Sequence, residues 1–203
     1  MTGRANQRLR TRTAIVTAAA GLSRTGREVT MPQVAEAALV SEATAYRYFP
    51  DLVGLLREAI ADQLPSAEEA LAPVACSADV VERVAAATEF LLRHVLARQG
   101  VVRAMIGATI ARPAEAAARP GLRFGLIEYA LAPAADGPRA PDAAALAQLR
   151  NDLAVIISAE ALFTLTDLHG LDPEAAVASI VRTASTLTRA RLGSESSETS
   201  RMR

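Results

Sequence analysis

The amino-acid sequence predicts an all-α protein, and three observations support that fold class. Apolar residues make up 51% of the 203-residue chain, whereas aromatic residues make up only 3%. Alanine is the most frequent residue, and alanine and leucine both favour helix over strand. No segment shows the strict apolar–polar alternation of a half-buried strand. We therefore expect about nine helices, packed closely through small side chains.

Four helices are expected in the first part of the chain. The first covers residues 8–23, because four apolar residues there share one helical face: Ile15, Ala18, Ala19 and Leu22. The fourth begins after Pro50 and Asp51, and its apolar stripe consists of Leu52, Leu55, Leu56, Ala59 and Ile60. Two shorter helices are expected between them, over residues 31–38 and 41–48.

The two short helices, separated by a two-residue turn, predict a helix-turn-helix at residues 31–50. Thr30 and Gln33 have the spacing of a capping box at the start of the first helix. Ser41 is the expected N-cap of the second. The second helix of such a motif can lie in the major groove of DNA. We therefore expect residues 1–60 to form a DNA-binding head.

The second helix of this motif carries polar and aromatic residues on its outer side. Three of the seven aromatic residues of the chain lie within residues 46–49. The positions expected to face the interior are Val34, Ala35, Ala38, Val40, Ala45 and Phe49. Those expected to face wholly or partly outward are Glu42, Ala43, Thr44, Tyr46, Arg47 and Tyr48. Hydroxyl groups and aromatic rings can bind phosphates, sugars and thymine methyls, whereas Arg47 either neutralises a phosphate or pairs with a neighbouring acid.

The charge of the chain is divided unevenly, although its net charge is zero. Residues 1–50 contain seven arginines and three glutamates, a net charge of +4, so the remainder carries −4. A basic N-terminal part on an acidic body is typical of a chain that binds a polyanion. The alternative is a basic surface that is merely solvated.

Residues 66–193 are expected to form a larger helical domain. A helix capped by Ser77 or Asp79 is expected to end at Gly100. Further helices are predicted over residues 101–112, 122–132, 142–169 and 173–192. Connecting segments and a disordered C-terminal tail are expected at residues 113–121, 133–141 and 194–203.

The first 60 residues resemble the DNA-binding domain of the TetR family of transcriptional regulators. The family pattern comprises a glycine, a threonine cap, an "IA" pair, an "A-G-V-S" turn and a "T-L-Y-R-Y-F" sequence. The corresponding residues are Gly26, Thr30, Val34-Ala35, Ala38-Leu39-Val40-Ser41 and Thr44-Ala45-Tyr46-Arg47-Tyr48-Phe49. Leu55 and Leu56 extend the match into the fourth helix. The resemblance implies a helix-turn-helix head followed by a divergent domain for effector binding and dimerisation.

The resemblance also implies which residues meet DNA. The threonine cap would bind a phosphate, the first turn of the second short helix would face base edges, and its tyrosines would contact backbone or base methyls. The arginines before and within the first helix would either reach phosphates or the minor groove, or remain a solvated charged end. The expected set is Arg8, Arg10, Arg12, Thr30, Ser41, Glu42, Ala43, Thr44, Tyr46, Arg47 and Tyr48.

Three departures from the family pattern affect the expected affinity for DNA. Leu39 replaces the usual glycine; a positive φ there costs on the order of 1 kcal/mol, and otherwise the turn differs. Glu42 replaces a cationic or amide residue and is repelled by phosphate, although it can accept from cytosine. Asp51 and Leu52 replace a serine–lysine pair, which removes a cation. We therefore expect modest affinity with a steep salt dependence.

In the TetR family the last two long helices pair with their copies in a second subunit. The matching helices here are apolar around much of their girth, so we expect a homodimer; a larger monomeric core is the alternative. The expected interface is Leu149, Leu153, Ile156, Ile157, Val177, Ile180, Val181, Ala184 and Leu187. The expected effector-pocket residues, each alternatively ordinary core, are Phe90, His94, Met105, Phe124, Tyr129 and Phe163.

The resemblance thus implies a regulator, most simply a repressor, that binds a palindromic duplex operator and leaves it on binding a small, mostly apolar effector. We expect no enzyme activity, cofactor or metal site, because the sequence lacks a nucleophile elbow, a glycine-rich phosphate loop and a histidine–cysteine cluster. Without a signal peptide or a membrane-length apolar run, we expect a cytoplasmic protein. The alternatives are a helical interaction protein that has lost DNA binding, or an enzyme.

Overall fold

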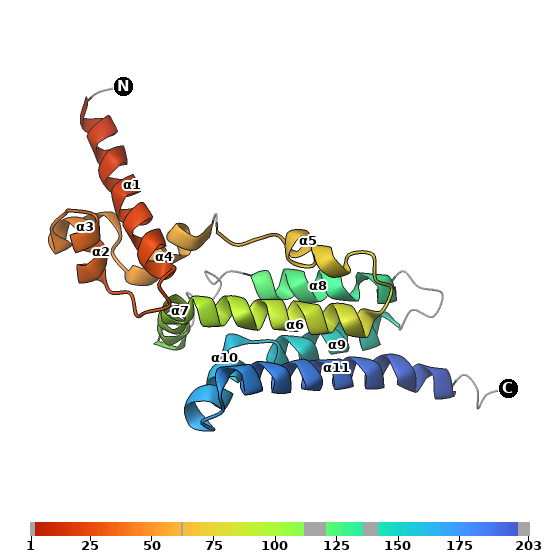
Figure 1. Ribbon diagram of the computed structural model, residues 1–203. Coiled ribbons are helices and arrows are strands. Elements are labelled where there is room, and N and C mark those ends of the chain that lie inside the picture. The colour runs from red at the N-terminus through yellow and green to blue at the C-terminus, as the bar shows by residue number, and fades with distance from the viewer. Residues whose placement is uncertain (1–2, 62, 112–120, 136–141, 199–203) are drawn as a thin grey trace. The chain divides into compact units, whose positions relative to one another are not determined.

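The computed structural model describes residues 3–61, 63–111, 121–135 and 142–198. Helices dominate these residues and no strand occurs among them, so the all-α prediction is confirmed (Figure 1). The chain divides into two compact units. The first unit consists of residues 1–64 and 95–120, and the second of residues 65–94 and 121–203. No helix in the described segments combines the length and the apolar character that a membrane span requires.

The first unit contains the four helices expected near the N-terminus and one more. They are α1 (Gly3–Ser23), α2 (Met31–Ala37), α3 (Glu42–Tyr48), α4 (Leu52–Ala61) and α7 (Gln99–Ala111). α1 packs against α2 and α4, α2 packs against α3, and α4 packs against α7. Their common core is built from buried side chains that include Ile15, Val34, Ala45, Leu55, Leu56 and Val101. α1 begins five residues before the predicted start at residue 8.

α7 contains a glycine that the sequence suggested as a helix end. Gly100 instead lies in the first turn of α7, where its N–H donates to the Gly26 carbonyl at 3.3 Å. A Cβ atom on Gly100 would lie 1.8 Å from the carbonyl oxygen of Arg27. The glycine therefore permits a close approach between α7 and the loop after α1. The first unit also includes residues 95–120, which the sequence analysis assigned to the larger domain.

The second unit is a packed group of helices that includes α6 as far as residue 94. Its elements are α5 (Ala67–Ala70), η1 (Ala72–Val74), α6 (Val80–Ala97), α8 (Leu122–Ala135), α9 (Ala143–Ile156), α10 (Ala159–Phe163), η3 (Thr164–Leu168) and α11 (Pro173–Glu198). α9 packs against both α8 and α11, and α5 packs against α8. Its buried side chains include Leu92, Leu126, Leu131, Leu153 and Leu162.

The helix predicted over residues 142–169 is interrupted. α9 ends at Ile156, and the Ser158 hydroxyl accepts from the Ala161 N–H and donates to the Val155 carbonyl, both at 3.0 Å. This serine caps α10, and the chain then continues as the π-helix η3. Apolar spacing alone did not reveal the break, because a serine within a helical pattern can also bond back to the preceding turn.

Two further boundaries differ from the predictions. α8 continues through Pro133 to Ala135, so the expected loop starts later. α11 runs to Glu198, past the predicted end at residue 192, and residues 194–198 are helical instead of disordered. The rest of that loop, most of the connection expected at residues 113–121 and the tail from residue 199 lie outside the described residues.

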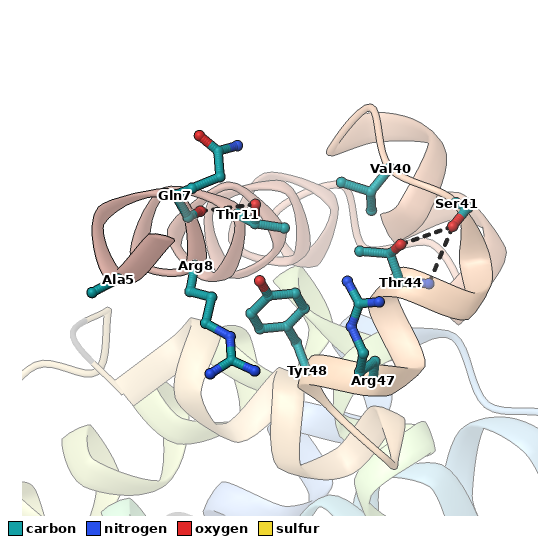
Figure 2. Close-up of a pocket in the computed structure, with 9 residues that line it drawn as sticks. All are labelled: Ala5, Gln7, Arg8, Thr11, Val40, Ser41, Thr44, Arg47 and Tyr48. Atoms are coloured by element: carbon teal, nitrogen blue, oxygen red, sulfur yellow. Dashed lines mark hydrogen bonds between the residues drawn. The ribbon is translucent and has the colours of Figure 1, made fainter. Parts of the chain in front are cut away.

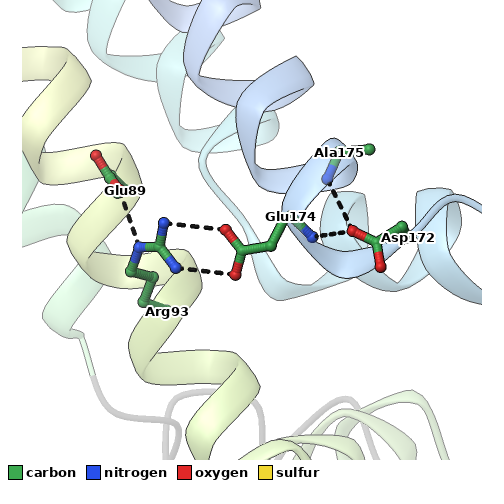
Figure 3. Close-up of polar contacts among 5 residues, drawn as sticks. All are labelled: Glu89, Arg93, Asp172, Glu174 and Ala175. Atoms are coloured by element: carbon green, nitrogen blue, oxygen red, sulfur yellow. Dashed lines mark hydrogen bonds and ion pairs between the residues drawn. The ribbon is translucent and has the colours of Figure 1, made fainter.

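Charged side chains join α6 to α11 in the second unit (Figure 3). The Arg93 guanidinium donates to both carboxylate oxygens of Glu174, at 3.0 and 3.1 Å, and to Glu89 at 2.9 Å. These hydrogen bonds, chiefly those with Glu174, raise the pKa of Arg93. Asp172 in turn accepts from the Glu174 N–H at 2.9 Å, so the first turn of α11 is capped where it meets α6.

Candidate nucleic-acid interface

The turn between α2 and α3 fixes how α3 leaves the first unit. The Leu39 N–H donates to the Glu36 carbonyl and the Val40 N–H donates to the Ala35 carbonyl, each at 3.0 Å. This pair of bonds is a Schellman motif, which requires a left-handed residue after the helix end. Leu39 is that residue, with a φ of 56°. The strained alternative predicted for this leucine is therefore the one that the structure adopts.

α3 is capped at one end and anchored through its inner face. The Ser41 hydroxyl accepts from the Thr44 N–H at 3.2 Å and lies 2.9 Å from the Thr44 hydroxyl, which confirms the predicted N-cap. The side chain of Ala45 is fully buried and that of Phe49 is 6% exposed. These anchors leave the opposite face of α3 turned to solvent.

The solvent-facing residues of α3 agree with the sequence-based division into inner and outer positions. Glu42, Ala43 and Arg47 are exposed, and the side chain of Tyr46 is 45% exposed. Thr44 and Tyr48 are half-buried. Nearly half of the surface of Tyr46 is in water, so this residue is accessible to a partner.

A groove of about 930 Å³ separates the N-terminal half of α1 from the turn and α3 (Figure 2). Its lining from α1 is Ala5, Gln7, Arg8 and Thr11, and its lining from the turn and α3 is Val40, Ser41, Thr44, Arg47 and Tyr48. Figure 2 shows the Tyr48 ring entering the groove with its hydroxyl directed toward α1. The Arg47 guanidinium carbon lies 5.7 Å from the centroid of that ring. Two arginines and several hydroxyls thus face one concave surface, which suits an anionic ligand.

Four groove residues were missed by the sequence analysis as candidates for binding. They are Ala5, Gln7 and Thr11 on α1, and Val40 in the turn before α3. Gln7 and Thr11 lie four residues apart, and the Thr11 hydroxyl donates to the Gln7 carbonyl at 3.0 Å. Helical spacing around the predicted Arg8 would have indicated Thr11, because residues three or four apart share a face.

Two other predicted DNA contacts remain on the surface of the first unit. Arg10 is exposed on α1. Thr30 is the half-buried N-cap residue of α2, and its N–H donates to the Gln33 side-chain oxygen at 3.0 Å. This bond is the half of the predicted capping box that orders the start of α2.

Arg12 is the predicted DNA contact that the structure places elsewhere. Its guanidinium forms a bidentate ion pair with the Glu58 carboxylate of α4, with one N···O distance of 2.6 Å. The same group lies 4.9 Å from the centroid of the Phe49 ring. Two of its guanidinium nitrogens bind Glu58, although 47% of the side chain is exposed, and we leave Arg12 out of the proposed phosphate contacts. Sequence spacing did not reveal this pair because its members lie 46 residues apart.

The start of α4 also follows from a side-chain contact. The Asp51 carboxylate accepts from the Gly54 N–H at 2.7 Å and so caps the helix. The N-terminal end of α4 is therefore occupied by an internal anion. This arrangement removes one phosphate site that a cation-bearing first turn would offer.

The six residues expected to line an effector pocket are divided between the two units. Phe90 and His94 stack with ring centroids 6.0 Å apart. They line a hollow of about 330 Å³ in the second unit, together with Ala70, Pro73, Val74, Ala86, Glu89 and Arg93. Met105 instead belongs to the core of the first unit. Of the others, Phe163 is buried, Tyr129 is half-buried beneath Arg83, and Phe124 is 57% exposed; none of these three lines that hollow. Within the described residues, no group of histidine, cysteine and carboxylate side chains could hold a metal ion.

Most residues expected at a dimer interface are already covered within one chain. The buried ones are Leu149, Leu153, Ile157, Val177, Ile180 and Ala184. α9 and α11, which carry most of them, pack against each other, so these side chains form the core of the second unit. Only the half-buried Ile156, Val181 and Leu187 remain from the expected set. Val155, which was not predicted, is 74% exposed.

Comparisons with known proteins agree with the helix-turn-helix geometry. Residues 14–59 match the family described as "Bacterial regulatory proteins, tetR family". The chain is similar in fold to a crystal structure of a TetR transcriptional regulator from Rhodococcus sp. RHA1. That match has a TM-score of 0.51 and 24% identity, and it covers 89% of this chain and 97% of the other. No curated protein matches the chain.

Proposed function

We propose that this chain is a DNA-binding regulator of the bacterial tetR family, which residues 14–59 match, and that it represses transcription from a duplex operator. The observation that supports this proposal most directly is the exposed face of α3 beside the groove of Arg8 and Arg47. A capped helix with a buried inner face and polar outer face is suited to the major groove. The basic groove next to it is suited to the phosphate backbone.

Each outer residue has a proposed role in this complex. We propose that Arg8, Arg47 and the Tyr48 hydroxyl bind phosphates, because they share the concave surface next to α3. The first turn of α3, which includes Glu42 and Thr44, faces base edges in the groove. The Thr44 hydroxyl already bonds to Ser41, so it contributes its methyl group to a base contact more readily than its hydroxyl.

We further propose that two copies bind a palindromic operator. A two-fold dimer presents two α3 helices to half-sites separated by whole turns of DNA. Apolar side chains that remain at the surface of the second unit support such pairing, with Val155 the most exposed in α9. Ile156, Val181 and Leu187 are only half-buried and are the other candidates.

Release by a small effector is the final part of the proposed function. The hollow lined by Phe90 and His94 offers apolar and aromatic surface with Glu89 and Arg93 at its polar side. A mostly apolar molecule of modest size suits such a site. We propose that its binding favours a conformation of the protein with lower affinity for the operator.

An electrophoretic mobility shift with a salt titration tests this function. The probe is the duplex immediately upstream of the gene for this chain, and the competitor is a shuffled duplex of the same composition. We expect selective binding that weakens steeply as salt rises. Arg8→Ala and Arg47→Ala should each make the slope of log Kd against log salt shallower by about 1, because each variant has one cation fewer to bind a phosphate.

The matched control is Arg182→Ala, which removes an exposed arginine from α11 in the second unit. It should leave both the affinity and the salt slope unchanged. Binding that ignores DNA sequence and salt would contradict the regulator and favour a helical interaction protein. The acidic Glu42 on α3 is the feature that makes this second possibility worth separating.

A further inference from the structure

Leu39 combines two properties that the folded chain does not explain. Among the described residues it is the one non-glycine residue with a positive φ, and its side chain is 92% exposed. The Schellman hydrogen bonds of its own N–H and that of Val40 impose the left-handed conformation. Glycine adopts that conformation without steric cost, whereas leucine does not. The leucine side chain therefore strains the turn and gains no packing from it.

The position of Leu39 is defined by its neighbours. Val40 and Ser41, the next two residues, line the groove that also contains Arg8 and Arg47. Leu39 therefore lies at the edge of the surface that we propose to bind DNA. A strained residue that persists at a functional surface is best explained by an interaction made in the complex.

We propose that Leu39 is an apolar specificity residue, which packs against the methyl group of a thymine in each operator half-site. The thymine methyl is the apolar group that the major groove exposes, and apolar side chains recognise it. This inference rests on the proposed function of α3. Unlike the arginine contacts, it carries no charge, so it contributes to base selection without altering the salt dependence.

Thymine-to-deoxyuridine replacement tests the contact, because it removes only the methyl group. The probe is the upstream duplex bound by the wild-type protein, in which thymines of one half-site are replaced singly. We expect one replacement to weaken wild-type binding about fourfold, the value for loss of one buried methyl group. Leu39→Gly should bind the unmodified duplex about tenfold more weakly and show no further loss on that replacement.

Three controls accompany this comparison of wild type and Leu39→Gly on the modified and unmodified duplexes. Leu39→Gly should unfold at a temperature at least as high as wild type, since glycine relieves the left-handed strain. Leu39→Met keeps an apolar side chain and should retain sensitivity to the replaced thymine. Ile110→Ala removes another exposed apolar side chain of the first unit, one that is 74% exposed on α7, and should change neither affinity nor sensitivity.

Two results would overturn the inference while leaving the proposed function intact. One is a Leu39→Gly variant that binds the unmodified duplex as tightly as wild type. The other is a Leu39→Gly variant that loses as much affinity as the wild-type protein does at every replaced thymine. If wild-type protein shows no selective binding to any duplex tested, the proposed function fails and this inference fails with it.

Discussion

Arg12 of α1 and Glu58 of α4 form a bidentate ion pair, and the Arg12 guanidinium also lies over the ring of Phe49, the C-cap residue of α3. The side chain of Arg12 is 47% exposed and that of Glu58 is 36% exposed. One arginine thus connects the helix that carries Arg8 to α4 and to the end of the proposed recognition helix. We propose that it holds the proposed DNA-binding surface in shape.

Replacing Arg12 should lower the stability of the protein and should have little effect on the salt dependence of DNA binding. Arg12→Ala should lower the free energy of unfolding by about 1 kcal/mol, because it removes both a partly exposed ion pair and a cation–π interaction. Urea unfolding measures the change, and Arg10→Ala on the same helix is the control expected to unfold like wild type. If Arg12→Ala made the salt slope of DNA binding as shallow as Arg8→Ala does, Arg12 would return to the set of phosphate contacts.

The exposed tyrosine of α3 should matter for binding and not for folding. Tyr46→Ala should weaken binding to the upstream duplex roughly tenfold, because it removes the tyrosine, 45% exposed in the free protein, that we propose packs against DNA. Thermal unfolding should change little. Tyr46→Phe separates the two parts of the side chain: affinity close to wild type assigns the contact to the ring, and a full loss assigns it to the hydroxyl. Wild-type affinity in Tyr46→Ala would contradict the proposed orientation of α3.

The helix-turn-helix could be predicted closely because local rules decide it. Thr30, Ser41 and the apolar spacing of α2 and α3 set the boundaries of both helices within a residue or so. The buried Ala45 and the exposed Tyr46 followed from the same helical period. Only the conformation of Leu39 was left open, because the sequence allowed two alternatives for this turn.

The features that the sequence did not predict depend on pairs of residues that are distant in the sequence. The Arg12–Glu58 ion pair and the approach of Gly100 to Arg27 join residues that no local pattern relates. The apolar stripes of α9 and α11 correctly predicted that these helix faces are buried. They did not predict whether the side chains that bury them belong to the same chain or to a second one. Periodicity reports that a face is buried and says nothing about its partner.

The start of α5 should respond to acid. The Ser66 N–H and hydroxyl donate to the Glu69 carboxylate at 2.8 and 3.0 Å, and these bonds lower the pKa of Glu69 below 4.5. Because this pKa is lower in the folded than in the unfolded state, the carboxylate stabilises the fold at pH values above the unfolded-state pKa. The contribution is lost as the pH falls through the folded-state pKa. The capping box should therefore open only at pH values below the ordinary pKa of a glutamate. Ser66→Ala removes the hydroxyl bond and keeps the backbone N–H bond, so an NMR titration of the Glu69 carboxylate should show a pKa higher than in wild type; an unchanged pKa would refute the contribution of the hydroxyl.

Arg83 is the buried cation that holds the second unit together locally. It is 3% exposed, and its guanidinium donates to four carbonyl oxygens at 2.7 to 3.2 Å: those of Val74, Ala75, Tyr129 and Ala130. Arg83→Met should lower the free energy of unfolding by about 3 kcal/mol, because one buried and three partly buried hydrogen bonds to backbone carbonyls are lost. Arg182→Met on the exposed side of α11 is the matched control and should change it little. Equal stability of the two variants would show that water replaces the guanidinium.

Two glycines of α7 should give opposite results when each is replaced by alanine. Gly100→Ala should destabilise the first unit by about 3 kcal/mol, since its Cβ would lie 1.8 Å from the Arg27 carbonyl oxygen and backbone must move to accommodate it. Gly107 has nothing within 4 Å of the corresponding position, so Gly107→Ala should stabilise the same helix by about 0.5 to 1 kcal/mol. Urea unfolding of both variants measures the contrast. If Gly100→Ala unfolded like Gly107→Ala, α7 would not lie against the loop after α1 in solution.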